Sequence, residues 1–139
     1  MKHSIKKSLK KIGIPTLNLK MEGHTYRFLI DTGSTFNYIA SSAFLKLKDE
    51  MKVVGETRTS GLNGMAAEQK IVNIKYTLGR RQQEEKFGIM SDSTFKELIE
   101  KTGIQIDGIV GLPFFVRNRV KIDYEAGFAE FHTPKEKRA

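Results

Sequence analysis

An aspartate follows directly on an apolar run, and this junction constrains the fold more than any other part of the sequence. The run Phe28-Leu29-Ile30 is typical of the end of a buried strand, and Asp31-Thr32-Gly33-Ser34 comes immediately after it. A carboxylate there is unfavourable unless its charge is used or hydrogen-bonded. Gly33 permits a tight turn that brings its N–H to the carboxylate, and two hydroxyl groups lie beside it. The segment indicates either a chemically used carboxylate or an ordinary Asp-containing turn.

Period-two alternation of apolar and polar residues predicts a mostly β domain. A hairpin is expected first, with strands over 14–20 and 24–30 around a Glu22-Gly23 turn. Further strands are predicted at 37–40, 53–54, 71–78, 87–90, 109–110, 120–124 and 128–132, with residues 79–85 as a charged connection. Two or three short helices are expected, over 41–47, over 93–99 with a stop at Gly103, and at 113–115. The chain of 139 residues fits one domain.

The positive charge of the chain is concentrated at its ends. The net charge is +8, and Met1 to Lys11 contains five lysines and no acidic residue. Residues 134–139 contribute +2, which leaves residues 12–133 at +1. A nearly neutral body does not indicate a specific nucleic-acid reader. We therefore expect a basic, flexible N-terminal tail over 1–12, a domain over 13–133 and a flexible C-terminal tail over 134–139, with weak contact to phosphates or an anionic membrane as the other use of the tails.

Several classes of site are not supported by the sequence. There is no cysteine, which excludes disulfides and thiolate ligands and favours a cytoplasmic setting. His3, His24 and His132 are isolated, so no metal site is predicted. No glycine-rich segment continues into Gly-Lys-Ser/Thr, and no cofactor is expected. No apolar run reaches the roughly 18 residues of a membrane span, and no apolar stretch of a secretory signal follows the basic N-terminus.

Three segments together resemble the aspartic peptidases. The hairpin that ends in Phe28-Leu29-Ile30-Asp31-Thr32-Gly33-Ser34 is similar to their active-site segment. Ile109-Val110-Gly111, followed by a helix start at Pro113, resembles their hydrophobic-hydrophobic-Gly signature, which threads beside the catalytic loop. The Gly-rich stretch between them contains Gly61, Leu62, Asn63 and Gly64, at the place where the family carries its substrate-binding flap. It lacks the aromatic residue of the pepsin flap.

The resemblance implies a retropepsin-like peptidase, with a single-lobe acid-protease β-barrel. Pepsin-like enzymes have two Asp-Thr-Gly segments in one chain, whereas this chain has one; Asp107-Gly108 lacks the intervening hydroxyl residue and is predicted to be a turn. Two carboxylates must share a proton in this chemistry. The implied enzyme is therefore a homodimeric aspartic endopeptidase that cuts extended polypeptides, with Asp31 from each copy activating a water.

The resemblance also implies a role for each residue of the loop. Thr32 would lock the two loops together across the twofold axis, and the Gly33 N–H and Ser34 hydroxyl would orient the carboxylates. Donation from Ser34 would place the pH optimum below neutrality and make Ser34→Ala shift the basic limb upwards. The alternative is a catalytically silent retropepsin-fold module for peptide binding or dimerisation. A serine hydrolase is not indicated, because Ser34 lacks the Gly-x-Ser-x-Gly frame.

Overall fold

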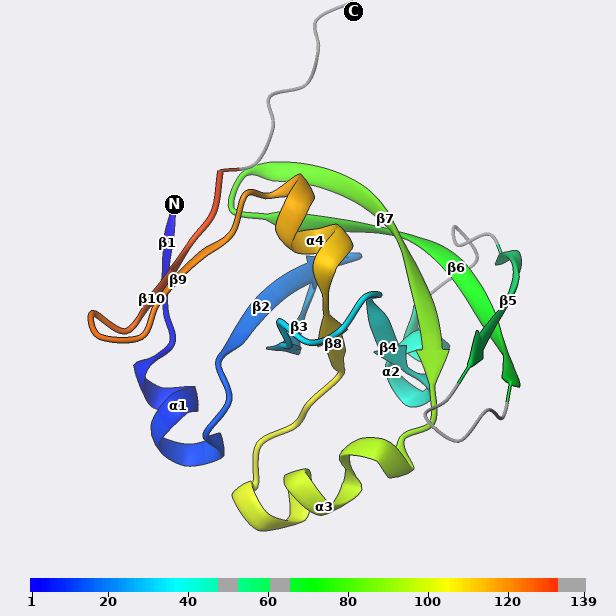
Figure 1. The fold of residues 1–139 in the computed structure, drawn as a ribbon, viewed down its shortest axis with the longest axis horizontal. Coiled ribbons are helices and arrows are strands. Elements are labelled where there is room, and N and C mark those ends of the chain that lie inside the picture. The colour runs from blue at the N-terminus through cyan, green and yellow to red at the C-terminus, as the bar shows by residue number, and fades with distance from the viewer. Residues whose placement is uncertain (48–52, 61–65, 133–139) are drawn as a thin grey trace, which may run out of the picture.

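Strands and short helices are interspersed along the chain (Figure 1). The computed structural model describes residues 1–47, 53–60 and 66–132. For 53–60 and 66–69 it describes the backbone only. Their order is β1 (Lys2–Ser4), α1 (Lys6–Ile12), β2 (Thr16–Met21), β3 (His24–Ile30), β4 (Tyr38–Ala40), α2 (Ser41–Lys46), β5 (Val53–Ser60), β6 (Ala66–Leu78), β7 (Arg81–Met90), α3 (Ser93–Thr102), β8 (Gly108–Val110), α4 (Leu112–Arg117), β9 (Lys121–Asp123) and β10 (Phe128–Glu130). The prediction of a mostly β domain is confirmed. Among these residues no helix is long and apolar enough to cross a membrane.

Six strands close into a barrel. Their order is β2-β3-β8-β4-β7-β6, and pairing of Lys20 in β2 with Thr77 in β6 joins the two ends. β5 pairs with β6 outside the ring, and β1, β10 and β9 form a separate small sheet beside it (Figure 1). Closure leaves fewer unpaired strand edges.

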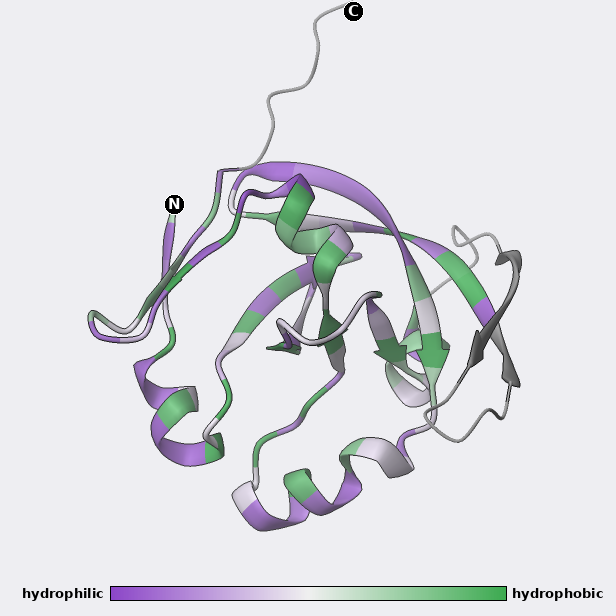
Figure 2. Ribbon diagram, in the orientation of Figure 1, coloured by the Kyte–Doolittle hydropathy of each residue, from purple (hydrophilic) through white to green (hydrophobic). Residues whose placement is uncertain are grey.

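The core lies inside the barrel, because alternate residues of each strand point to opposite faces. In β2, Leu17, Leu19 and Met21 are buried while Asn18 and Lys20 are exposed. Figure 2 shows this alternation along β2 as successive hydrophobic and hydrophilic segments. The hydrophobic interior therefore follows directly from the period of the sequence.

β8 holds both sides of the loop that carries Asp31. It runs parallel to β3, with Ile30 paired with Val110, and antiparallel to β4, with Tyr38 paired with Ile109. Residues 31–37 connect β3 to β4. The loop is thus anchored at both of its ends on one central strand.

The N-terminal residues are part of the folded unit, so the prediction of a flexible tail over 1–12 is wrong. β1 pairs with β10 through Lys2↔Glu130, His3↔Ala129 and Ser4↔Phe128. Ile5 is 1% exposed and belongs to the core. The lysines of α1 face outwards while its few apolar side chains face inwards, which composition alone does not reveal. The predicted tail over 134–139 lies outside the described residues.

Two further predictions need correction. Residues 79–85 are not a connection: the turn is at Gly79 and Arg80, and β7 begins at Arg81. Within it Gln83 and Glu85 are buried and alternate with exposed neighbours, so polar side chains there still follow strand periodicity. The described residues also contain four helices rather than two or three, and the additional one is α1.

Candidate active site

Asp31 lies where the buried strand β3 ends. Its backbone N–H donates to the carbonyl of Val110 at 3.1 Å, which continues the β3–β8 pairing by one residue. Leu29 and Ile30 are buried, whereas Asp31 is exposed. The sequence therefore places the carboxylate at the first solvent-accessible position after the barrel interior.

A tight turn fixes the Asp31 side chain. The N–H of Ser34 donates to the Asp31 carbonyl at 3.1 Å, which closes the turn. The N–H of Gly33 donates to Asp31 Oδ1 at 3.0 Å, the contact predicted from the sequence. One carboxylate oxygen is thus held by the backbone, and Thr32 and Gly33 are exposed beside it.

The Ser34 hydroxyl does not contact Asp31 in the chain, which corrects the expected hydrogen bond. Ser34 Oγ donates to the carbonyl of Phe36 at 2.6 Å and accepts from the Phe36 N–H at 3.4 Å. Short hydroxyl side chains commonly bond to backbone groups two residues away. The hydroxyl hydrogen is therefore engaged by the Phe36 carbonyl and not by Asp31.

The hydrophobic-hydrophobic-Gly segment packs against this loop. The N–H of Leu112 donates to the Ser34 carbonyl at 2.9 Å. A Cβ atom on Gly111 would lie 2.4 Å from the carbonyl oxygen of Phe36 and 2.7 Å from that of Ser34. Backbone atoms cannot yield as a flexible side chain can, so only glycine fits between them. Ile109, Val110 and Gly111 are therefore brought beside the Asp31 loop.

A buried polar network that the sequence did not reveal holds the end of the loop. Asn37 is fully buried; its Oδ1 accepts from the Gly111 N–H at 2.8 Å, and its Nδ2 donates to Glu85 Oε2 at 2.8 Å. Glu85 Oε1 accepts from the Tyr76 hydroxyl at 2.6 Å and lies 3.1 Å from Arg117 Nε. Side chains of β6 and β7 are thereby hydrogen-bonded to the end of the Asp31 loop.

Burial dominates the protonation equilibria within this network. It raises the pKa of Glu85 above its usual value, and hydrogen bonds from Tyr76 and Asn37 and the charge of Arg117 oppose that rise. Burial also raises the pKa of Tyr76, with the neighbouring Glu85 adding to the effect. Tyr76 therefore remains a hydroxyl donor. The only sequence signal for this network is Glu85 at an inward-facing position of β7, next to buried Phe87.

The remaining candidate residues are those of the predicted flap and Asp107. The predicted flap residues Gly61, Leu62, Asn63 and Gly64 lie outside the described residues; β5 and β6 pair up to Ser60↔Ala66 on either side of them. Asp107 is 8% exposed, and its Oδ2 accepts from the Arg27 N–H at 2.9 Å. That contact gives Asp107 a structural role at the entry to β8. Over the described ranges, no three His, Asp or Glu residues are placed to hold a metal.

Solved structures of retropepsin-like proteins share this fold. A retropepsin-like aspartic protease from Rickettsia conorii aligns with a TM-score of 0.59 and 14% identity, over 94% of this chain and 88% of that one. The retroviral protease-like domain of Ddi1 from Leishmania major aligns with a TM-score of 0.56 and 13% identity, over 90% and 98%. EIAV protease, complexed with the inhibitor HBY-793, aligns with a TM-score of 0.54 and 16% identity, over 74% and 86%.

Sequence comparison agrees with the structural one. Curated proteins include no significant match to this chain. Residues 17–114, which run from β2 to α4 and include the whole Asp31 loop, match the family described as aspartyl protease. The match covers well over half of the chain. On this evidence the chain belongs to the aspartyl protease family and is retropepsin-like in fold.

Proposed function

We propose that this protein is an aspartic endopeptidase whose active site forms between two copies of the chain. The observation that carries the proposal is the exposed Asp31 carboxylate, held by the Gly33 N–H at 3.0 Å on a loop clamped by β8. A carboxylate that served only a turn would not need this rigid setting. Membership of the aspartyl protease family supports the same chemistry.

The second carboxylate must come from a second copy. The sequence contains one Asp-Thr-Gly segment. Asp107, the other Asp-Gly, has its carboxylate engaged by the Arg27 backbone. Two Asp31 side chains meeting at a twofold axis would share one proton, because two carboxyl groups held close together cannot both ionise easily. The ionised carboxylate would take a proton from a water, and the protonated one would donate to the scissile carbonyl oxygen.

An exposed apolar surface beside the loop supports dimerisation. Leu112 and Val116 of α4 are 52% and 68% exposed, and Leu112 is bonded through its N–H to Ser34 of the loop. With Phe36 and Pro113 they line one side of a hollow of about 870 Å³. Contiguous apolar patches at the surface often mark interaction sites, whereas single exposed apolar side chains do not. We infer that the second copy covers this side of the molecule, with Thr32 linking the two loops.

The first test is proteolysis of an unfolded polypeptide such as reduced, denatured casein. Asp31→Asn is expected to abolish cleavage, because it removes the general base with almost no change in shape. Asp123→Asn is the matched control, since Asp123 is also an exposed aspartate at the end of a strand, and its carboxylate also accepts a backbone N–H. Equal cleavage by the Asp31→Asn variant and the wild type would exclude the mechanism.

A mixing experiment tests the shared site. Asp31→Asn chains added to a fixed amount of wild type should inhibit it, because mixed dimers contain one carboxylate and cannot cleave. Asp123→Asn chains added in the same way should raise the activity. Dilution should lower the specific activity as dimers dissociate. Absence of inhibition with chains that demonstrably exchange would contradict a shared dyad, and a stable dimer without any cleavage would favour the binding module.

A further inference from the structure

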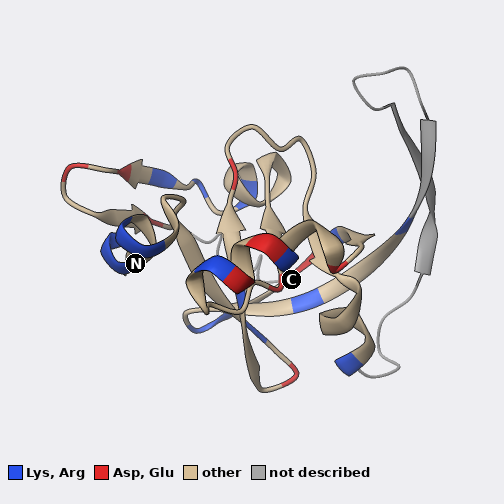
Figure 3. Ribbon diagram, turned by 90° about the horizontal axis from the view of Figure 1, so that it is seen from below, with Lys and Arg blue, Asp and Glu red and all other residues tan. Residues whose placement is uncertain are grey.

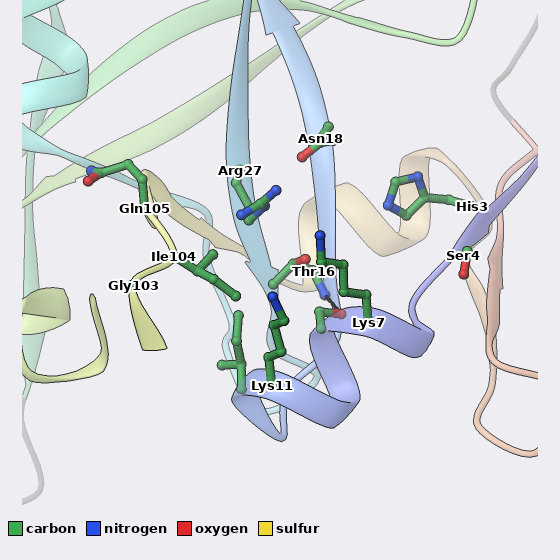
Figure 4. A pocket seen from close by; sticks show the side chains of 12 residues that line it. His3, Ser4, Lys7, Lys11, Thr16, Asn18, Arg27, Gly103, Ile104 and Gln105 are labelled. Atoms are coloured by element: carbon green, nitrogen blue, oxygen red, sulfur yellow. Dashed lines mark hydrogen bonds between the residues drawn. The ribbon is translucent and has the colours of Figure 1, made fainter. Parts of the chain in front are cut away.

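A polar pocket of about 420 Å³ lies outside the Asp31 loop, and no residue of 31–34 lines it. Four segments that are distant in the sequence surround it: β1, α1, the β2–β3 hairpin and the residues that follow α3 (Figure 4). Only the folding of the N-terminal residues onto the body creates this space. The volume falls within the range of small-molecule sites, about 300–1,000 Å³.

The charged groups of this pocket are all basic. Lys7, Lys11 and Arg27 line it, His3 stands at its side, and it has no Asp or Glu in its lining. Figure 4 shows the two lysine side chains and Arg27 extending over the same face of the hairpin. Figure 3 shows how densely Lys and Arg residues cover α1. Over the described residues, no carboxylate pairs with any of these three cations. Among the described residues, their mutual repulsion is therefore not offset by a direct ion pair.

The spacing of the cations is set by secondary structure. Lys7 and Lys11 are four residues apart on α1 and so share one helix face. Arg27 pairs with Asn18 across the hairpin, and directly opposed residues of an antiparallel pair point to the same side of the sheet. The backbone of Arg27 is fixed on both sides by Asp107, whose Oδ2 and N–H bond to it at 2.9 and 2.8 Å. One wall of the pocket is thus preformed, while the lysines can adjust.

The pKa of His3 responds to the positive charge of this pocket. Burial lowers the pKa of its imidazole, a backbone hydrogen bond to Thr16 raises it, and the positive charge of Arg27 lowers it again. Neutral hydrogen-bonding groups complete the lining, including Ser4, Thr16 and Asn18. A ligand that carries negative charge would gain from the three cations and from these groups together.

We propose that this pocket binds a small anion with two or more phosphate groups. Arginine presents a planar fork that matches phosphate oxygens, and lysines supply point charges around it. A compact polyanion meets all three cations at once, whereas a single carboxylate does not. A pocket of about 420 Å³ suits a compact anion, whereas nucleic acid needs an extended basic surface. The ligand is either a free phosphorylated compound or the phosphorylated headgroup of a lipid.

Pyrophosphate is the probe for the free ligand. Isothermal titration calorimetry of the full chain, in about 0.15 M salt to screen exposed charges, is expected to give one bound pyrophosphate per chain. Arg27→Gln and the double variant Lys7→Gln/Lys11→Gln should each weaken binding about tenfold or more. The control is Lys6→Gln/Lys10→Gln, which makes the same charge change at the same spacing on α1 but outside the pocket lining. Thermal unfolding verifies that each variant is folded.

Vesicles distinguish the two sources. Phosphatidylcholine vesicles with and without phosphatidylinositol 4,5-bisphosphate are sedimented with the protein, in the presence or absence of pyrophosphate. Vesicle binding that pyrophosphate displaces and Lys7→Gln/Lys11→Gln abolishes identifies a lipid headgroup, and pyrophosphate binding without vesicle binding identifies a free ligand. The proposal is overturned if neither probe binds, or if the Lys6→Gln/Lys10→Gln control loses as much binding as the pocket variants.

Discussion

Asn37 Oδ1 accepts a 2.8 Å hydrogen bond from the backbone N–H of Gly111, 74 residues further along the chain. The same side chain donates through Nδ2 to Glu85 Oε2 at 2.8 Å. Asn37 therefore connects the end of the Asp31 loop to the end of β8 and to β7. A side chain that can both donate and accept is required at this buried position.

Replacing Asn37 by leucine should destabilise the protein strongly. Leucine has a similar size but leaves the Gly111 N–H without a partner and removes one donor from Glu85, and each buried group left unpaired costs about 1–3 kcal/mol. Asn73→Leu is the control, because Asn73 is only half-buried. The free energy of unfolding in urea measures both. Similar losses in the two variants would show that the Asn37 contacts contribute little.

Ile5→Ala tests whether the N-terminal residues belong to the fold. Ile5 is 1% exposed, and truncation of a fully buried isoleucine to alanine costs about 2–5 kcal/mol. Ile14, at 37% exposure, provides the control variant Ile14→Ala, for which a smaller loss is expected. Urea unfolding of the full chain decides between them. If Ile5→Ala lowered the free energy of unfolding no more than Ile14→Ala, the N-terminal residues would be a detachable tail after all.

The sequence predicted the barrel because its signals are local and periodic. Alternation in β2 and the apolar run before Asp31 identify inward-facing residues without any knowledge of the partner strands. The prediction of a flexible N-terminal tail was wrong for the opposite reason. Five lysines dominate the composition of Met1 to Lys11, and the residues that pack inwards are few. Ile5, Leu9 and Ile12 do occur at helical spacing, but burial depends on β10, more than a hundred residues away.

The turn that carries Asp31 was predictable from the sequence, and the residues that support it were not. Asp31, with the Gly33 N–H on its carboxylate, follows from four adjacent residues. The bond from Asn37 to Glu85 spans 48 residues and exists only because β4 pairs with β7. The direction of the Ser34 hydroxyl depends on a side-chain rotamer, which no sequence pattern specifies. Long-range pairing and rotamers are decided by packing.

Glu85 should make stability depend on pH. Burial raises its pKa in the folded state above the ordinary value of 4.5, so the folded chain holds this proton more tightly than the unfolded chain does. The resulting stabilisation is fully present below pH 4.5 and is lost as the pH rises through the raised folded-state pKa. Wild type should therefore lose stability relative to Glu85→Gln, which cannot titrate, as the pH rises above 4.5.

The measurement is the free energy of unfolding of both proteins at a series of pH values. Glu84→Gln, at the exposed neighbouring residue, is the matched control, and its difference from wild type should stay flat. A wild type that gains stability relative to Glu85→Gln as the pH rises would mean that the hydrogen bonds from Tyr76 and Asn37 and the charge of Arg117 outweigh burial.

Ser34→Ala separates the two possible roles of its hydroxyl, given the proposed peptidase activity. The resemblance to aspartic peptidases implies donation to Asp31, so that loss of the hydroxyl would move the basic limb of the pH–rate profile upwards. In the chain the hydroxyl donates instead to the Phe36 carbonyl at 2.6 Å. We therefore expect Ser34→Ala to lower stability by about 0.5–1.5 kcal/mol and to leave the basic limb in place.

Ser41→Ala, at a half-buried serine in α2, controls for the loss of a hydroxyl elsewhere. The profiles must be recorded at concentrations where all three proteins are dimeric, because dissociation would lower the rate at any pH. An upward shift found only in Ser34→Ala would show that the hydroxyl turns towards the carboxylate when the two copies meet.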